Sequence, residues 1–173
     1  MSRSIQEHER EYIRWQNRAL RFYLGARLCF LYDLCSAAAF CAQQSLESLL
    51  KGTLVYWDQS CDPKLANHKS AKMLRTLRNK AKGATGQEIP EYFYAAGRYQ
   101  TASRYPTSAP GIAIPKTFLA DLDKAFSDLV QLVPFQFNSE LWRLLASEDS
   151  RERRVLTDSN HQVGELARFL KTT

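Results

Sequence analysis

A 3.6-residue period runs through the first part of the chain and restricts that part to a helical fold. The stretch from Ile5 to Leu31 holds no proline and a single glycine. Its apolar residues recur every three or four positions, at Tyr12, Trp15, Ala19, Phe22, Ala26 and Cys29. This spacing gathers the apolar side chains on one face of a helix, so the chain is predicted to begin with one long amphipathic helix.

The same period predicts further helices along the chain. A second helix runs to about Asp58 and is rich in strong helix formers, with Asp33 or Ser36 as the candidate N-cap. Pro90 suits the first turn of a fourth helix, and Pro134 ends a fifth. The helices expected after the second cover residues 64–82, 90–99, 116–133, 139–146 and 159–170.

These elements predict an all-α fold, an antiparallel up-and-down bundle of four to five helices. The composition changes after Pro134, where short apolar clusters alternate with a charged stretch from Glu148 to Arg154. We therefore expect two parts, a bundle over residues 1–134 and a C-terminal helical extension over residues 135–173. No sequence repeat suggests a solenoid.

The composition excludes several protein classes. A hydrophobic fraction of 45% and a charged fraction of 24% are ordinary for a folded globular domain. The most apolar stretch, Leu20 to Phe40, is interrupted by charged residues and falls short of the ~20 apolar residues that cross a bilayer. Charged residues precede any apolar stretch at the N-terminus, which is unlike a secretory signal. The sequence therefore predicts a cytoplasmic protein without a membrane span.

Four cysteines occur in the chain, at Cys29, Cys35, Cys41 and Cys61. They form no CxxC pair and lie in or beside apolar segments, so we expect reduced thiols that pack as small apolar residues. The sequence predicts neither a metal site nor a cofactor.

The formal net charge of +6 favours contact with phosphate, because positive charge attracts nucleic acid whatever its sequence. Much of the charge lies in the first helix, where Arg10, Arg14, Arg18 and Arg21 share one face. A solvated face is the simplest interpretation of this pattern. A surface for RNA or a nucleotide and a surface for an acidic partner are the alternatives.

The second helix carries the segment FCAQQSLESLLKGTL at residues 40–54, which resembles the F-x-A-Q-Q-x-x-E-x-x-L-K pattern of HEPN domains. The preceding AL-RFYLGARLCF is similar to the first helix of that family. Asn67, His68 and Lys69 resemble the start of its third helix, and the R-Y-P sequence beginning at Arg104 resembles a family loop. Order and spacing agree over residues 14–133.

The resemblance implies a four- or five-helix up-and-down bundle that is frequently dimeric, so we expect a homodimer. Family members include RNA-cutting toxins, partners of minimal nucleotidyltransferases, and accessory modules that bind nucleotides or proteins. The resemblance therefore implies a binding module for a nucleotide, RNA or a nucleotidyltransferase-type protein partner.

Four neighbouring residues of the matched segment are candidates for ligand binding: Gln43, Gln44, Glu47 and Lys51. Glu47 and Lys51 are four positions apart, in the order that favours an ion pair on one helix face. Gln43 and Gln44 point about 100° apart, so one can face a neighbouring helix or groove while the other faces solvent. Support of the helix and contact with a ligand are both open for this group.

A second candidate group surrounds the R-Y-P loop and consists of His68, Lys69, Lys72, Arg98, Arg104 and Tyr105. His68 opens the predicted third helix, where it can cap the helix or act in catalysis. Arg104 can hold a phosphate through two hydrogen bonds or pair with a carboxylate. We expect an anionic ligand to dock near Arg98 and Arg104, with Lys69 and Lys72 adding attraction.

The ribonucleases of the family carry an arginine and a histidine a few residues apart near the penultimate helix. That helix and its loop here contain Arg98 and Arg104 and no histidine, so no catalytic residue is predicted. Similar pairs elsewhere are Arg3 with His8, at a terminus expected to fray, and Arg154 with His161, in the extension. A toxin-like ribonuclease with a non-standard site at His68 or His161, and a purely structural dimerisation module, are the alternatives.

Circular dichroism provides the first test. We expect a dominantly helical spectrum, because each strongly periodic segment has the 3.6-residue period. A strand content above about a tenth, against the 20–25% of an average globular protein, would contradict the all-α prediction.

Overall fold

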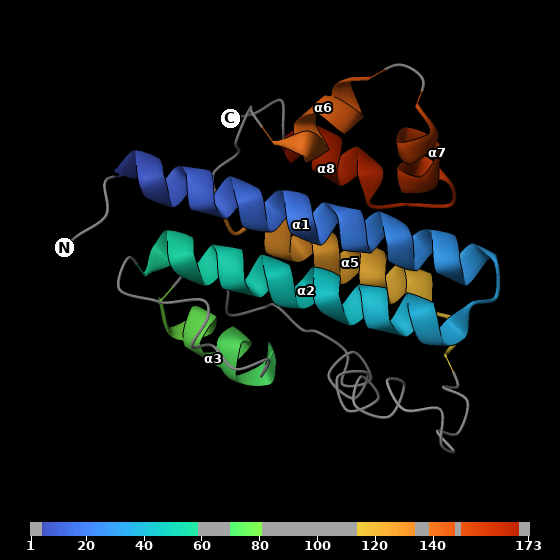
Figure 1. Ribbon diagram of the computed structural model, residues 1–173, viewed down its shortest axis with the longest axis horizontal. Helices are drawn as coiled ribbons and strands as arrows, with labels where there is room; N and C mark the ends of the chain where they lie inside the picture. Colours follow the sequence, from blue (N-terminus) through green and yellow to red (C-terminus); the bar gives the residue numbers. More distant parts are fainter. Residues whose placement is uncertain (1–4, 59–69, 81–113, 134–138, 148–149, 170–173) are drawn as a thin grey trace.

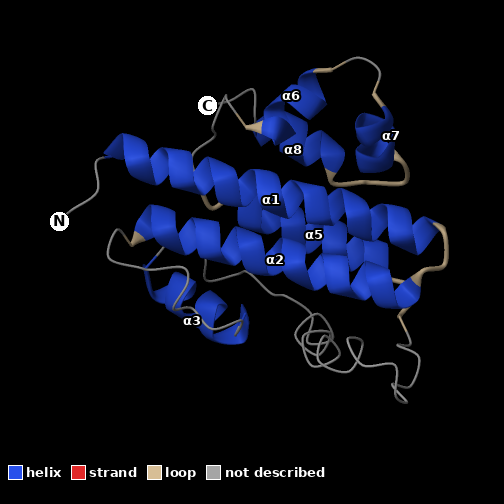
Figure 2. Ribbon diagram, in the orientation of Figure 1, coloured by secondary structure: helices blue, strands red, loops and turns tan. Residues whose placement is uncertain are grey.

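The computed structural model of the protein describes residues 5–58, 70–80, 114–133, 139–147 and 150–169. Every regular element within these ranges is a helix (Figure 2). The all-α prediction is therefore confirmed. The helices are α1 Ile5–Leu31, α2 Cys35–Trp57, α3 Ser70–Lys80, α5 Phe118–Val130, α6 Glu140–Ala146, α7 Arg151–Thr157 and α8 Val163–Phe169.

The two long helices form an antiparallel hairpin on which the other elements pack (Figure 1). α5 lies behind the hairpin, α3 packs on α2, and α6 to α8 lie along the opposite side of α1. Gly52 permits the close approach of α1 and α2, because a Cβ there would lie 2.7 Å from the Cβ of Trp15. The hydroxyl of Ser45 also donates a hydrogen bond to the carbonyl of Ala19, at 2.9 Å.

The turn between α1 and α2 corrects the predicted helix cap. Leu34, not Asp33 or Ser36, is the N-cap of α2, and no side chain caps the helix there. Asp33 instead ends α1 in the left-handed region, with φ 56°. The amides of Leu34 and Asp33 donate to the carbonyls of Cys29 and Phe30, at 2.8 and 3.0 Å, which closes a Schellman motif.

The C-terminal part holds three described helices, whereas two were predicted. The unpredicted helix is α7, which begins inside the charged stretch that we did not expect to be helical. The hydroxyl of Ser150 accepts a hydrogen bond from the amide of Arg153 at 3.0 Å and caps the helix. Glu152 in the first turn adds a favourable charge. A serine followed closely by an acid is the signal that could have revealed this helix.

The extension packs on the same core as the bundle. Leu141 of α6, Leu156 of α7 and Leu166 of α8 are fully buried, in one cluster with residues such as Leu50 and Phe126. The division at residue 134 stays a prediction about the organisation of the sequence.

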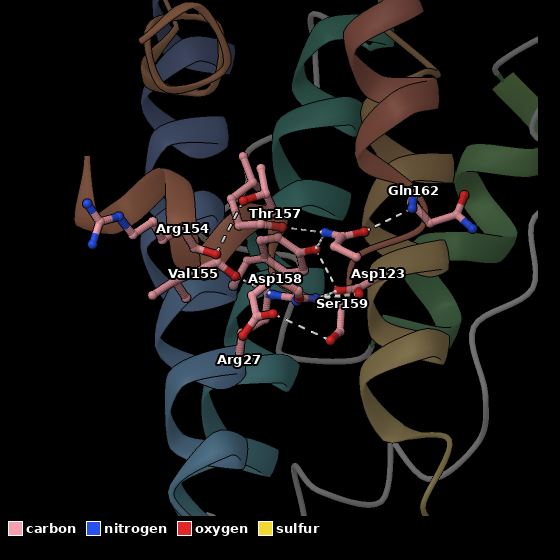
Figure 3. Close-up of polar contacts among 11 residues, drawn as sticks. Arg27, Asp123, Arg154, Val155, Thr157, Asp158, Ser159 and Gln162 are labelled. Carbon is pink, nitrogen blue, oxygen red and sulfur yellow. Dashed lines mark hydrogen bonds and ion pairs between the residues drawn. The ribbon is translucent and has the colours of Figure 1, made fainter. Parts of the chain in front are cut away.

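A fully buried arginine joins α1, α5 and the turn after α7 (Figure 3). Arg27 donates to both carboxylate oxygens of Asp123 on α5. It also donates to the carbonyl of Val155, at 2.7 Å, and to that of Asp158. Burial disfavours its charge, yet the hydrogen bonds with Asp123 raise the pKa of Arg27. The sequence showed Arg27 only as an interruption of an apolar stretch.

Tyr23 and Asn160 extend this buried network. The hydroxyl of Tyr23 donates to Asp123 at 2.6 Å, and the amide of Asn160 donates to the Tyr23 oxygen at 2.7 Å. The same amide group also donates to the carbonyl of Leu156, at 2.8 Å. Burial, and then the charge of Asp123, raises the pKa of Tyr23, so its hydroxyl stays protonated. The network holds the end of α7 against α1 and α5.

Replacing Asp123 with alanine is expected to lower the free energy of unfolding by about 3–5 kcal/mol, because it leaves the Arg27 charge buried without its partner. Urea denaturation measures this change.

Asp128→Ala is the matched control on the same helix. Asp128 pairs with the exposed Lys124 at 2.8 Å, and such a surface pair contributes about 0–1 kcal/mol. Equal losses for the two variants would contradict a structural role for the buried pair.

Candidate functional site

The first predicted group, on α2, forms an internal polar chain. Lys51 pairs with the Glu47 carboxylate at 2.7 Å, which confirms the predicted ion pair. The Gln43 amide donates to Glu47 at 3.0 Å, and the Gln44 amide donates to the Gln43 oxygen at 3.0 Å. Gln43, Glu47 and Lys51 are all buried, and Gln44 is half-buried.

This ion pair is buried, whereas i,i+4 spacing on a helix by itself suggests an exposed pair. The Lys51 ammonium lies 5.7 Å from the centre of the Trp15 ring on α1. The bonded polar side chains of α2 therefore contribute, through Lys51, to the contact between α1 and α2. Buried side chains that bond to each other are suited to stabilising α2 and its packing on α1. These contacts favour a structural role for the four residues.

The second predicted group is described only at Lys72, which is exposed on α3. His68, Lys69, Arg98, Arg104 and Tyr105 lie outside the described residues, and their roles stay predictions. Arg75, one turn after Lys72, is also exposed, so this part of α3 presents positive charge to solvent.

The two described histidines of the alternative pairs lie in different settings. His8 is buried in α1, so the expectation of a frayed terminus at that residue is wrong. His161 is exposed in the turn before α8. Arg154 is exposed too, and its side chain extends away from the buried network (Figure 3). Arg154 and His161 are thus both exposed, and a catalytic role for them stays a prediction.

A hollow of about 570 Å³ lies between the middle of α1 and the start of α6. Its size is within the range of small-ligand sites. The lining residues are Arg14, Asn17, Arg18, Arg21, Phe22 and Glu140. Three of the four arginines of the basic face predicted from the sequence thus line one concave surface.

Glu140 is the one carboxylate among the described lining residues of this hollow, and an arginine engages it. Arg21 holds Glu140 through two hydrogen bonds, at 3.1 and 2.5 Å. The Glu140 amide donates to the Asn17 side chain at 2.9 Å, which fixes the start of α6 against α1. Glu140 and Asn17 cannot be recognised as site residues from the sequence. Their contacts join residues far apart in the chain: Arg21 and Glu140 are 119 positions apart, and Asn17 and Glu140 are 123 positions apart.

The other two arginines are open to a ligand. The Arg18 guanidinium lies 5.8 Å from the centre of the Trp15 ring and 5.6 Å from that of Phe22, so the two aromatic side chains restrain it. Arg14 and Arg18 are exposed. Within the described part of the chain neither pairs with a carboxylate.

Other kinds of site find no support in the described residues. Cys29, Cys35 and Cys41 are free thiols, and burial, followed by the neighbouring Cys29, raises the pKa of Cys41 to about 11. No group of three metal-ligating side chains occurs in the ranges that the structure covers. Even the longest of the described helices lacks an apolar run that would span a bilayer.

The family model of the HEPN domain matches residues 12–130, which covers most of α1 and all of α2, α3 and α5. No curated protein and no solved structure matches the chain.

The internal chain on α2 gives a prediction about stability. Lys51→Ala is expected to lower the free energy of unfolding by about 1–3 kcal/mol, because the buried Glu47 carboxylate loses a charged partner. Binding of ATP or a short RNA should stay unchanged.

Lys124→Ala is the matched control, since this lysine forms an i,i+4 ion pair of similar length on the surface of α5. A Lys51→Ala variant that keeps its stability and loses ligand affinity would reverse the structural assignment.

Proposed function

Because the chain belongs to the HEPN domain family, we propose that it is a binding module that holds a phosphate-bearing ligand, a nucleotide or an RNA, without cutting it. The observation that carries this proposal is the hollow between α1 and α6. It offers two exposed arginines, Arg14 and Arg18, that no described carboxylate engages.

The chemistry of the hollow suits a phosphate. A guanidinium donates two parallel hydrogen bonds to phosphate oxygens and keeps its charge at any physiological pH. Arg14 and Arg18 are one helical turn apart, so their side chains can reach the same group. Arg18 loses little freedom on binding, because Trp15 and Phe22 already restrain it.

The surrounding charge supports the same ligand. No acidic residue occurs in the sequence from Tyr12 to Tyr32, which covers most of α1. Glu140 is neutralised by Arg21, so the hollow keeps a positive potential. With a net charge of +6, the chain attracts phosphate-bearing molecules over a longer range as well.

The residues around the hollow favour binding over cleavage. Cleavage of RNA requires a group that removes a proton from the 2′-hydroxyl and a group that stabilises the phosphate charge. Among the described residues, the lining of the hollow offers arginines for the second task and no histidine for the first. A homodimer and a nucleotidyltransferase-type partner, both implied by the family resemblance, stay predictions beside this proposal.

The double variant Arg14→Ala/Arg18→Ala is expected to weaken binding of ATP or a short RNA about tenfold or more, because it removes charge-assisted hydrogen bonds to phosphate. Isothermal titration at low and high salt measures the affinity. The variant should also show a shallower dependence on salt, since it releases fewer counterions.

Lys116→Ala/Lys124→Ala is the control, because it removes two exposed positive charges, one just before α5 and one on α5, that do not line the hollow. If both double variants weaken the binding affinity equally, the effect comes from net charge alone, and the proposed site is wrong. The RNA should be recovered intact. Cleavage that disappears in His68→Ala or His161→Ala would establish the ribonuclease alternative instead.

A further inference from the structure

A second hollow lies further along α1. It has a volume of about 580 Å³ and lies between the C-terminal half of α1 and α7. One wall consists of Leu24 and Leu28 of α1 and of Tyr32 in the turn that follows, and Arg151, Arg154 and Val155 supply most of the α7 wall. It therefore combines apolar and aromatic surface with two arginines.

Both hollows open on the same face of α1. At about 100° per residue, Arg14, Arg18, Arg21, Gly25 and Leu28 all point within about 40° of one line along the helix, and Tyr32 follows in the turn after it. Arg14 and Tyr32 are 18 residues apart, which corresponds to about 27 Å at about 1.5 Å per residue. This face is opposite Tyr23, which packs on Phe126 of α5 with ring centres 4.1 Å apart.

The wall formed by α7 is fixed in place. The carbonyls of Val155 and Asp158 accept hydrogen bonds from the buried Arg27, which ties the C-terminal end of α7 to α1. Arg151 and Arg154 are exposed on this wall, with Glu152 as its acidic residue. The groove is thus formed before any ligand arrives, which lowers the entropic cost of binding.

We propose that the two hollows are parts of one groove that binds a single-stranded RNA along α1. This inference rests on the proposed function and adds the class of ligand and a second subsite. Arg14 and Arg18 hold phosphates at one end, and Arg151 and Arg154 hold phosphates at the other. In the second hollow, beside Arg151 and Arg154, Tyr32, 72% exposed, and Leu28, 45% exposed, contact unpaired bases.

The alternation of charge and apolar surface selects a single strand over a duplex. Unpaired bases stack on aromatic side chains, while the bases of an RNA duplex are hidden and leave such side chains without a partner. A single nucleotide can fill one hollow only. A strand that reaches both gains the second set of contacts within one complex, which raises its affinity.

The test compares uridine monophosphate with a uridine octamer by isothermal titration. We expect the octamer to bind at least tenfold more tightly than the monophosphate. Arg151→Ala/Arg154→Ala should weaken the octamer about tenfold and leave the monophosphate within twofold. Arg14→Ala/Arg18→Ala should weaken both ligands, and Lys116→Ala/Lys124→Ala should affect them equally and slightly.

Tyr32→Ala is a second variant, chosen because Tyr32 is exposed and its loss does not open the core. It should weaken the octamer without changing the salt dependence, since it removes stacking and no charge. An RNA duplex of the same length should bind less tightly than the single strand.

The outcomes separate the two proposals. If the octamer binds no more tightly than the monophosphate, or if Arg151→Ala/Arg154→Ala leaves the octamer unchanged, the continuous groove is wrong and the proposed function stands. If neither ligand binds, the proposed function fails together with it.

Discussion

A guanidinium removed from solvent is the interaction on which the rest of this structure depends. Burying a charge is costly, and it is tolerated only where the charge and its hydrogen-bond donors are matched. Arg27 meets a carboxylate of α5 and two carbonyls at the end of α7, so three separate parts of the chain must assemble around it. The position of α7 on α1, and with it one wall of the proposed groove, follows from this requirement.

The long first helix serves two purposes through opposite faces. One face carries Tyr23 and Arg27 into the core, and the helix approaches α2 closely where Gly52 lies against Trp15. The other face is exposed, has no acidic residue after Glu11, and ends at Tyr32. A rigid helix held on three sides presents its charged side chains at defined positions, which a flexible segment cannot do.

The contacts of the α2 segment that resembles the HEPN pattern favour a structural role. Gln43, Glu47 and Lys51 bond to one another along α2, and Lys51 lies over Trp15 of α1, so these polar residues support α2 and its packing on α1. This explains why the pattern identifies the family while leaving the ligand open. The residues proposed to bind phosphate lie on α1 and, for the groove, on α7, outside that segment.

The sequence by itself determined the two long helices and α5, because the 3.6-residue period is local and can be read without neighbours. It also placed Arg14, Arg18 and Arg21 on one face and Glu47 beside Lys51. Only the tertiary structure decided that Arg21 forms an ion pair with Glu140, that Arg27 is buried against Asp123, and that α7 lines a hollow. Each of these contacts joins residues about a hundred or more positions apart, and their energies depend on burial. The local spacing of residues carries no information about contacts over such separations or about the burial of the groups involved.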